Sequence, residues 1–412
     1  MRISGSRAGE GGKERERAGT LPGLATALTV IAAFTAPAHA QTRRDLTSFF
    51  QQAVAEEGIV GAGMYLVTRD GVIDSAFAGF ADRETGRQAN GATIWHWASI
   101  TKTFGAIAVM QYRDRGRLRL DDPIVQYVPE LERAHNPYGP MRQVTVRHLL
   151  SHTSGFRSGT WPWGGNQPWH PFEPTEWAQV VAMLPYTRLE FPPGSKYQYS
   201  NPGYVFLGQV VSRLAGEDWE VYLQKNVLSP LGMTHAYFDI TPYHLLKDRS
   251  NNYSVKDGTT TAQGLDFDTG ITVSNGGLNA PLADMAKYLR FLLGATPGDA
   301  NPLPRTTLEE MWTVQAASQA GEVLGTGVGL GYFIEQRGQV RLIGHTGSQA
   351  GFRSFFWIHP ESGLGIIANF NTAPAQESGE NVRPNVRRVF QGLIERFAAL
   401  TQADRRRGGG AE

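Results

Sequence analysis

The sequence predicts an α+β fold, in which helices flank an antiparallel sheet and a mostly helical subdomain is embedded within the chain. Segments typical of strands occur near both ends of the sequence, and residues from about 112 to 266 consist mostly of helical segments and loops rich in proline or glycine. Strands from the two ends must pair to bury their apolar faces. Residues 41–400 are therefore expected to form one domain.

The N-terminal part of the predicted sheet is a hairpin. Residues 64–68 and 72–78 are strand-like and are joined by Arg69-Asp70-Gly71, a sequence typical of a tight turn. A short helix at residues 45–57 is expected to precede the hairpin.

The last third of the chain returns to strands and ends in a helix. Residues 345–351 are expected to form a turn between two of these strands, and a helix is expected from about 386 to 400. Residues 401–412 are expected to be a disordered tail. The four predicted strands lie at residues 328–335, 339–344, 352–359 and 363–371.

Residues 1–40 have the pattern of a secretory signal peptide. Five basic residues precede an apolar stretch at 21–34, and Ala38-His39-Ala40 forms a small-residue cleavage site. A membrane anchor is the alternative, but Pro22 and Gly23 leave fewer uninterrupted apolar residues than the ~20 that a spanning helix needs. We therefore expect a periplasmic or secreted protein that keeps no stable membrane span after cleavage.

The composition argues against several classes of function. The 412 residues carry 39 Lys and Arg against 38 Asp and Glu, a balance that gives no support for a nucleic-acid partner. The chain has no cysteine, which excludes disulfides, thiolate metal sites and cysteine nucleophiles. Because 41% of the residues are hydrophobic, the chain has enough apolar surface for a substantial core.

A candidate nucleophile, Ser99, precedes a predicted buried helix. From Phe104 onward, apolar residues recur at helical spacing. Ser99 would lie on the first turn, where free backbone N–H groups favour developing negative charge. Lys102, three residues later, faces the same side and would remove the serine proton once burial lowers its pKa. The alternative is a helix-capping serine followed by a surface lysine.

Two further short motifs make this serine informative. Tyr199-Ser200-Asn201 precedes a helix predicted to begin near Tyr204, and His345-Thr346-Gly347 lies at the predicted turn between strands. Each motif occurs once, and each taken alone is usual in loops or turns. The ordered set of Ser-x-x-Lys, Tyr-x-Asn and His-Thr-Gly in three separate segments indicates a shared site.

This set resembles the serine β-lactamase and penicillin-binding protein superfamily, whose elements include Ser-x-x-Lys and Lys-Thr-Gly. The closer match is the class C-like branch, which carries Tyr-x-Asn and includes class C β-lactamases, D-Ala-D-Ala carboxypeptidases, D-aminopeptidases and esterases. The resemblance runs from about residue 45 to 395 and implies a β-lactamase/transpeptidase-like fold. Further similar stretches are Leu149-Leu150-Ser151-His152-Thr153-Ser154-Gly155, Phe191-Pro192-Pro193-Gly194, Leu228-Ser229-Pro230-Leu231-Gly232-Met233 and Asn275-Gly276-Gly277-Leu278.

The resemblance also implies a role for each residue of the site. Ser99 attacks the carbonyl carbon, Lys102 and Tyr199 share the role of base, and Tyr199 returns the proton to the leaving group. The substrate-binding residues are Asn201, which meets a substrate amide, His345 and Thr346, which meet a substrate carboxylate, and the adjoining Gly347 and Ser348. Backbone N–H groups of Ser99 and Ser348 would form the oxyanion hole. No cofactor or metal ion is implied.

The sequence leaves the substrate open. Histidine at position 345, where lysine is usual in class C β-lactamases, looks more like the carboxypeptidase and D-aminopeptidase members. β-Lactams and D-alanyl-type amides are the leading substrates, so the expected partner is a small molecule or a cell-wall peptide. An esterase of the same superfamily and a catalytically idle, penicillin-binding-like scaffold or sensor are the alternatives.

Two other patterns have competing explanations. His148 and His152 stand four residues apart, the spacing of a zinc pair, but they lack the glutamate of a His-Glu-x-x-His site, so a structural hydrogen-bonding role is favoured. Residues 159–177 hold four of the nine tryptophans among prolines and glycines. This loop is either a lid over a cleft or a flap packed for its own stability.

Overall fold

The computed structural model describes residues 36–159, 174–266, 268–295, 301–318, 325–375 and 384–408. The chain divides into two compact units, Met1–Gln41 and Thr42–Glu412. Most of the predicted signal peptide lies outside the described residues. Among the residues that are described, no helix is both long enough and apolar enough to cross a membrane.

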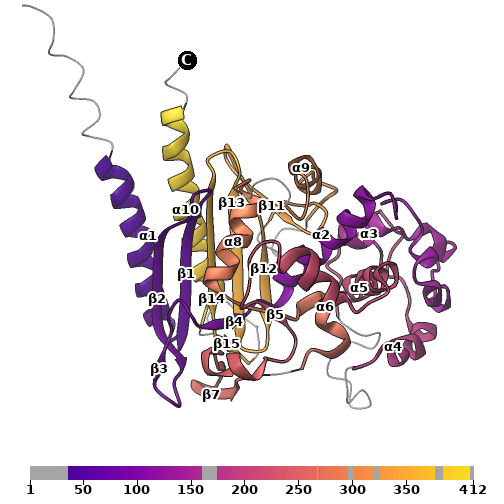
Figure 1. Cartoon of the computed structure of the whole chain (residues 1–412), viewed down its shortest axis with the longest axis horizontal. Coiled ribbons are helices and arrows are strands. Elements are labelled where there is room, and N and C mark those ends of the chain that lie inside the picture. Colours follow the sequence, from indigo (N-terminus) through magenta and orange to yellow (C-terminus); the bar gives the residue numbers. More distant parts are fainter. Residues whose placement is uncertain are drawn as a thin grey trace, which may run out of the picture. The chain divides into compact units, whose positions relative to one another are not determined.

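The unit from Thr42 onward is built on a sheet that joins the two ends of the chain (Figure 1). In the described residues, nine strands form this antiparallel sheet in the order β3-β2-β1-β14-β13-β12-β11-β10-β9. The N-terminal strand β1 pairs with the C-terminal strand β14, so the predicted α+β fold is confirmed. The strands are β1 (Gly61–Thr68), β2 (Val72–Asp82), β3 (Arg87–Gln88), β9 (Ala316–Ala317), β10 (Gly327–Val328), β11 (Phe333–Arg337), β12 (Val340–Gln349), β13 (Phe352–His359) and β14 (Leu364–Phe370).

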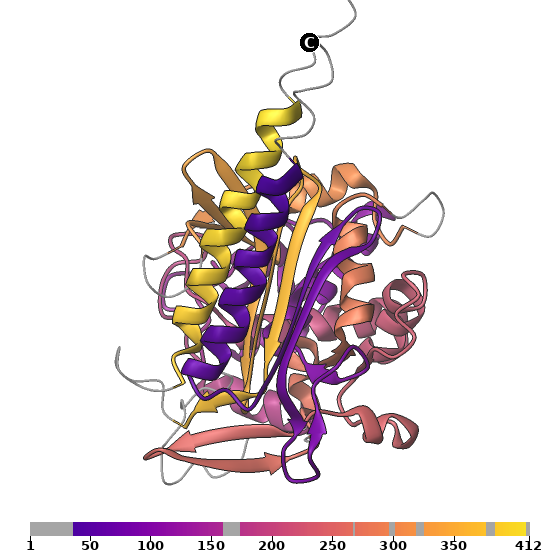
Figure 2. The same cartoon turned by 90° about the vertical axis from the view of Figure 1, so that its left-hand side faces the viewer.

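Helices cover both faces of this sheet. One face packs against α10 (Val386–Gly408) and against the part of α1 (Ala36–Glu56) from Leu46 onward; these two helices run side by side in Figure 2. The Arg396 guanidinium of α10 lies 3.8 Å from the centre of the Phe49 ring of α1. The other face packs against α2 (Thr101–Asp114) and α8 (Leu282–Leu292). The sheet is therefore covered on both sides, which explains why nearly every residue of β13 and β14 is buried.

The middle of the chain, which the sequence predicts as a mostly helical lobe over about residues 112–266, contains strands as well as helices. Two strands, β6 and β7, lie within it as a hairpin around Asp257 and Gly258, and β6 pairs with β15. Polar, threonine-rich β7 gives no apolar strand signal in the sequence. The lobe helices are α3 (Val146–Leu150), α4 (Trp177–Met183), α5 (Asn201–Ala215) and α6 (Trp219–Leu223).

The remaining elements link the lobe to the main sheet. A second small sheet has the strand order β4-β8-β5. The elements not yet given bounds are β4 (Ile94–His96), β5 (Tyr237–Phe238), β6 (Asn252–Lys256), β7 (Thr259–Gly264), α7 (Val273–Gly276), β8 (Leu278–Pro281), α9 (Arg305–Met311) and β15 (Thr372–Pro374).

Three predicted boundaries in the last third of the chain need correction. Strand β12 continues to Gln349, so His345-Thr346-Gly347 lies inside a strand and the turn is shorter than predicted. The predicted strand 328–335 is split into β10 and β11 by a tight turn that ends with the Gly329 N–H donating to the Tyr332 carbonyl at 2.8 Å.

The third correction concerns the C-terminus. Helix α10 continues to Gly408, beyond the predicted end at residue 400, so the predicted tail is helical over residues 401–408. Thr401 is buried, and its hydroxyl donates to the Ala398 carbonyl at 2.8 Å, so the helix still packs on the domain at this point. Residues 409–412 lie outside the described residues.

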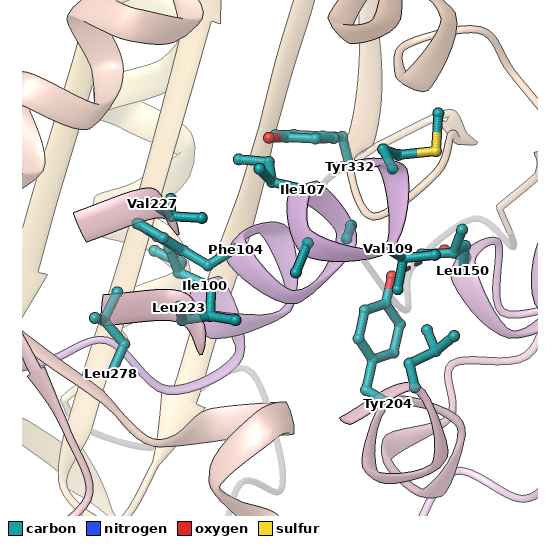
Figure 3. Packing of buried hydrophobic residues seen from close by; sticks show 14 of the residues in the cluster. Ile100, Phe104, Ile107, Val109, Leu150, Tyr204, Leu223, Val227, Leu278 and Tyr332 are labelled. Atoms are coloured by element: carbon teal, nitrogen blue, oxygen red, sulfur yellow. Dashed lines mark hydrogen bonds between the residues drawn. The ribbon is translucent and has the colours of Figure 1, made fainter. Parts of the chain in front are cut away.

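Helix α2 is buried on every side, as the sequence predicts for the segment after Ser99. Its residues from Thr101 to Tyr112 are all buried. In Figure 3, Phe104 points toward Leu223 and Val227, while Val109 points toward the lobe, near Tyr204. A helix packed on all sides holds its first turn in a fixed position between the lobe and the sheet.

Candidate active site

Ser99 lies on a single 3₁₀ turn (Ala98–Ile100) that leads directly into α2. The preceding residue, Ala98, has a φ of 49°, which non-glycine residues rarely adopt. The Thr101 hydroxyl donates to the Ala98 carbonyl at 2.6 Å and fixes the turn. Trp97 and Ala98 are buried while Ser99 remains partly exposed, so the turn presents the serine hydroxyl to solvent.

Lys102 is buried directly beside this serine. Its Nζ lies 3.0 Å from the Ser99 hydroxyl and 2.7 Å from the Asn275 carbonyl. Among the described residues no carboxylate forms an ion pair with Lys102, and burial holds its pKa well below the usual value. An amine whose pKa is lowered in this way, within hydrogen-bond distance of a serine hydroxyl, is better able to accept its proton.

Tyr199 approaches Ser99 from the lobe. Burial raises the pKa of its phenol, and the nearby Ser99 hydroxyl acts in the opposite direction with a smaller effect, so the phenol stays protonated at neutral pH. The Nζ atom of Lys102 lies 5.0 Å from the centre of the Tyr199 ring. The two neighbours of Ser99 thus have pKa values shifted in opposite directions, which is the arrangement expected of a base and an acid that work together.

Asn201 contributes an unpaired acceptor to the same region. It is the first residue of α5, where the Ser200 hydroxyl accepts the Gly203 N–H at 3.3 Å as a helix cap. The Oδ1 atom of Asn201 is buried and has no hydrogen-bond partner among the described residues. Buried polar atoms are normally satisfied, so this oxygen is available to an N–H group of a substrate.

Strand β12 contacts the backbone beside the turn that carries Ser99 (Ala98–Ile100, called the nucleophile turn below), and the two approach very closely at Gly347. A Cβ atom at this position would lie 2.3 Å from both the Trp97 carbonyl oxygen and the Ser354 hydroxyl oxygen. The Ser354 hydroxyl donates to the same Trp97 carbonyl at 3.1 Å. This contact brings Ser348, which is exposed, beside the turn that carries Ser99. The oxyanion-hole role of their backbone N–H groups remains a prediction.

The edge of β12 facing the site is open. Strand β11 pairs with β12 only from Val340 to Gly344, so the residues from His345 onward have β13 on one side and the nucleophile turn on the other. Thr346 is partly exposed on this stretch. The sequence predicted that a turn would carry the third motif, His345-Thr346-Gly347. In the structure the motif lies on the edge of a strand.

The surroundings of His345 disfavour a positive charge on its ring, and its predicted contact with a substrate carboxylate remains a prediction. The ring stacks on Phe333 with centroids 4.3 Å apart, and its Nδ1 lies 2.6 Å from the Thr346 carbonyl oxygen. Burial, aided by the nearby Lys102, lowers the pKa of His345 to about 3. The imidazole therefore carries no charge between pH 5 and 8.

His148 and His152, which have the spacing of a zinc pair, both accept backbone hydrogen bonds. His148 completes a capping box at the start of α3, where its Nδ1 accepts the Thr145 N–H at 3.3 Å. The Nδ1 atom of His152 accepts the Ser200 N–H at 3.0 Å. In the described part of the chain, no three His, Asp or Glu residues are arranged to hold a metal ion.

Sequence reasoning missed two residues of the site. The Asn275 carbonyl holds Lys102, and Tyr204 places its ring 5.7 Å from the lysine Nζ. The stretch beginning at Asn275 was noticed only for its family resemblance, because a backbone carbonyl leaves no mark in a sequence. Residues 160–173, most of the tryptophan-rich loop, lie outside the described residues, so both interpretations of that loop stay predictions.

The fold and the cluster of Ser99, Lys102 and Tyr199 agree with the family that the sequence resembles. The chain belongs to the Beta-lactamase family, whose model matches residues 46–390. Protein flp of Staphylococcus aureus (strain COL) is 24% identical over 333 residues, which cover 80% of this chain and 64% of that protein. The chain therefore spans less than two thirds of that relative.

Two further comparisons agree with this assignment. Esterase EstB of Burkholderia gladioli is 34% identical over 205 residues, which cover 47% of this chain and 50% of that protein. Among solved structures, the octameric penicillin-binding protein homologue from Pyrococcus abyssi matches with a TM-score of 0.70 and 26% identity, covering 86% of this chain and 77% of that one.

Proposed function

We propose that the protein cleaves a carboxylic ester or amide through an acyl-enzyme on Ser99. The Ser99 oxygen bonds to the carbonyl carbon while its proton passes to the Lys102 amine. When the tetrahedral intermediate collapses, the bond to the leaving group breaks, Tyr199 donates its proton to that group and regains one from the Lys102 ammonium. Water then releases the acid by the same steps. The opposite pKa shifts of Lys102 and Tyr199 support this division of roles.

The substrate that fits this site best is an ester without a carboxylate beside the scissile bond. The observation that carries this choice is the neutral, stacked His345, which offers a substrate carboxylate a hydrogen bond but no charge. The similarity to esterase EstB supports the same choice. An uncharged His345 therefore gives this position a polar side chain without the positive charge that a lysine would supply to a carboxylate.

A second candidate is a β-lactam or D-alanyl-type amide from a small molecule or cell-wall peptide. The unpaired Oδ1 of Asn201 favours it, because an amide substrate supplies the N–H donor that a simple ester lacks. The open edge of β12 offers further backbone groups to an extended peptide. A catalytically idle scaffold is disfavoured, because the hydrogen bond between Lys102 and Ser99 is intact.

The proposal includes a location outside the cytoplasm. The basic residues, apolar stretch and Ala38-His39-Ala40 site of residues 1–40 support export to the periplasm or the medium. N-terminal sequencing of the protein recovered from its producing cells tests this point: a mature N-terminus at Gln41 is expected, and a chain that retains residues 1–40 in the cytoplasm would contradict it.

A matched set of substrates tests the choice of substrate. We would measure kcat/KM for p-nitrophenyl butyrate, for the p-nitrophenyl monoester of succinic acid and for benzylpenicillin, with wild type and His345→Lys. Wild type is expected to prefer the butyrate, and the lysine variant to shift toward the two carboxylates. A wild-type preference for benzylpenicillin or the succinate would overturn the ester assignment, and absence of turnover with all three would favour the scaffold.

A further inference from the structure

His152 follows α3 in a backbone conformation that few residues adopt. Its φ is 56°, in the left-handed region, and it is buried with 1% of its surface exposed. The N–H of the next residue, Thr153, donates back to the His148 carbonyl at 2.8 Å, which closes the turn. Such strain persists only where the surroundings hold it, and it clusters at functional sites.

His152 forms hydrogen bonds with the backbone on both sides of Tyr199. The His152 carbonyl accepts the N–H of Gln198 at 2.9 Å, and its ring Nδ1 accepts the N–H of Ser200 at 3.0 Å. The backbone N–H groups of the residues immediately before and after Tyr199 are therefore both bonded to His152. Because the Ser200 N–H is buried, the ring nitrogen is needed to satisfy it.

The ring of His152 also packs against the tyrosine itself. Its ring centroid lies 4.4 Å from that of Tyr199, at an interplanar angle of 32°, and 5.0 Å from that of Tyr204. Burial lowers the pKa of His152, and the nearby Lys102 and His345 act in the same direction. The lowered pKa agrees with the geometry, in which Nδ1 carries no proton and accepts the Ser200 N–H.

We propose that His152 is a positioning residue that places the Tyr199 hydroxyl at Ser99 through one acceptor, its Nδ1 atom. This inference rests on the proposed proton transfer by Tyr199. When the acceptor is lost, the Ser200 peptide is released and Tyr199 moves with it. A misplacement of about 1 Å at a reacting group costs on the order of 10²-fold in rate, so the effect falls on kcat and leaves KM nearly unchanged.

Two substitutions at His152 separate the acceptor from the backbone. Asparagine and glycine both tolerate a positive φ, but only His152→Asn keeps an acceptor, Oδ1, at the place of Nδ1. His148→Ala is the matched control, because it removes a histidine that also accepts a backbone N–H, four residues earlier in the same segment. All three are assayed with p-nitrophenyl butyrate, and their folding is followed by circular dichroism and thermal unfolding.

We expect His152→Gly to lower kcat about 10- to 100-fold, His152→Asn to recover most of that loss, and His148→Ala to lower the Tm without changing kcat. Equal kcat losses for the asparagine and glycine variants would overturn the role of the acceptor. If the glycine variant does not fold, the asparagine variant decides alone: a kcat near wild type supports the proposal, and a folded variant with a 100-fold loss overturns it.

A double-mutant cycle with Tyr199→Phe distinguishes this inference from the proposed function. In the Tyr199→Phe background, His152→Gly is expected to cause little further loss of kcat, because both changes act through the same hydroxyl. Losses that multiply would show that His152 acts elsewhere. If Tyr199→Phe has wild-type kinetics, the proposed proton transfer fails first, whereas a large effect of Tyr199→Phe with none from His152→Gly overturns only the inference about His152.

Discussion

Replacing Gly347 by alanine should separate strand β12 from the turn that carries Ser99. The added Cβ would lie 2.3 Å from the Trp97 carbonyl oxygen and 2.3 Å from the Ser354 hydroxyl oxygen. Real Cβ atoms essentially never come within 3.0 Å of such atoms, so a shift of at least about 0.7 Å is required. One of these atoms belongs to the backbone just before Ser99 and cannot rotate away.

Two effects of Gly347→Ala follow, one on stability and one on rate. Overpacking of this kind costs about 1–3 kcal/mol of the free energy of unfolding. A displacement approaching 1 Å between Ser348 and Ser99 is expected to lower kcat/KM by up to about 10²-fold. Urea unfolding and initial rates with p-nitrophenyl butyrate measure the two effects.

Gly105→Ala is the matched control for this substitution. Gly105 lies within α2, and the atoms nearest to a Cβ there would be Trp219 atoms at 3.6 Å and 3.8 Å and the Ser274 carbonyl at 3.9 Å, which are ordinary contacts. Alanine should therefore stabilise the helix by roughly 0.5–1 kcal/mol and leave the rate unchanged. Wild-type rate and stability in Gly347→Ala would refute the close contact between β12 and the nucleophile turn.

Three further predictions concern the titrating groups of the site. Lys102→Met should abolish acylation. Because burial lowers the pKa of Lys102 in the folded state only, wild-type stability should rise relative to this variant, by up to about 1.4 kcal/mol per pH unit, as the pH rises toward the unfolded lysine pKa of about 10.4. A stability difference in urea unfolding that does not change with pH would contradict it. Tyr199→Phe should stay folded and slow stopped-flow acylation or deacylation by roughly 10²–10⁴-fold, whereas wild-type traces would make the tyrosine structural. The folded-state pKa of His345 is about 3, below the unfolded value, so stability is lost as the pH falls below about 6.5. His345→Phe should reduce this loss by up to about 1.4 kcal/mol per pH unit between pH 6 and 4. If the slope of stability against pH in acid unfolding is unchanged, the imidazole is not neutral.

The sequence was most informative where function depends on local spacing. Residues three apart on a helical turn face the same side, so Ser99 and Lys102 could be paired before the structure, and their side chains do lie 3.0 Å apart. The turn residues Arg69-Asp70-Gly71 likewise located the hairpin of β1 and β2. Both features are set by neighbours in the chain, which is why the sequence alone sufficed.

Features that depend on distant segments could not be predicted. The pKa of His345 is lowered by burial, and the Phe333 ring that stacks on it is held there by the pairing of β11 with β12 in one particular register. The hydrogen bond from Lys102 to the Asn275 carbonyl joins residues 173 positions apart. The hydrogen bonds from the backbone beside Tyr199 to His152 likewise join distant parts of the chain. In the sequence, the stretch that contains His152 shows only a family resemblance.

The measurement that tests the account most directly is the mass of the enzyme during turnover. Wild type and Ser99→Ala are mixed with p-nitrophenyl butyrate, quenched with acid within the first turnovers, and digested for peptide mass analysis. We predict one butyryl group on the wild-type peptide that contains Ser99 and none on the alanine variant. A butyryl group on another residue, or turnover by Ser99→Ala at the wild-type rate, would contradict the assignment of Ser99 as the nucleophile.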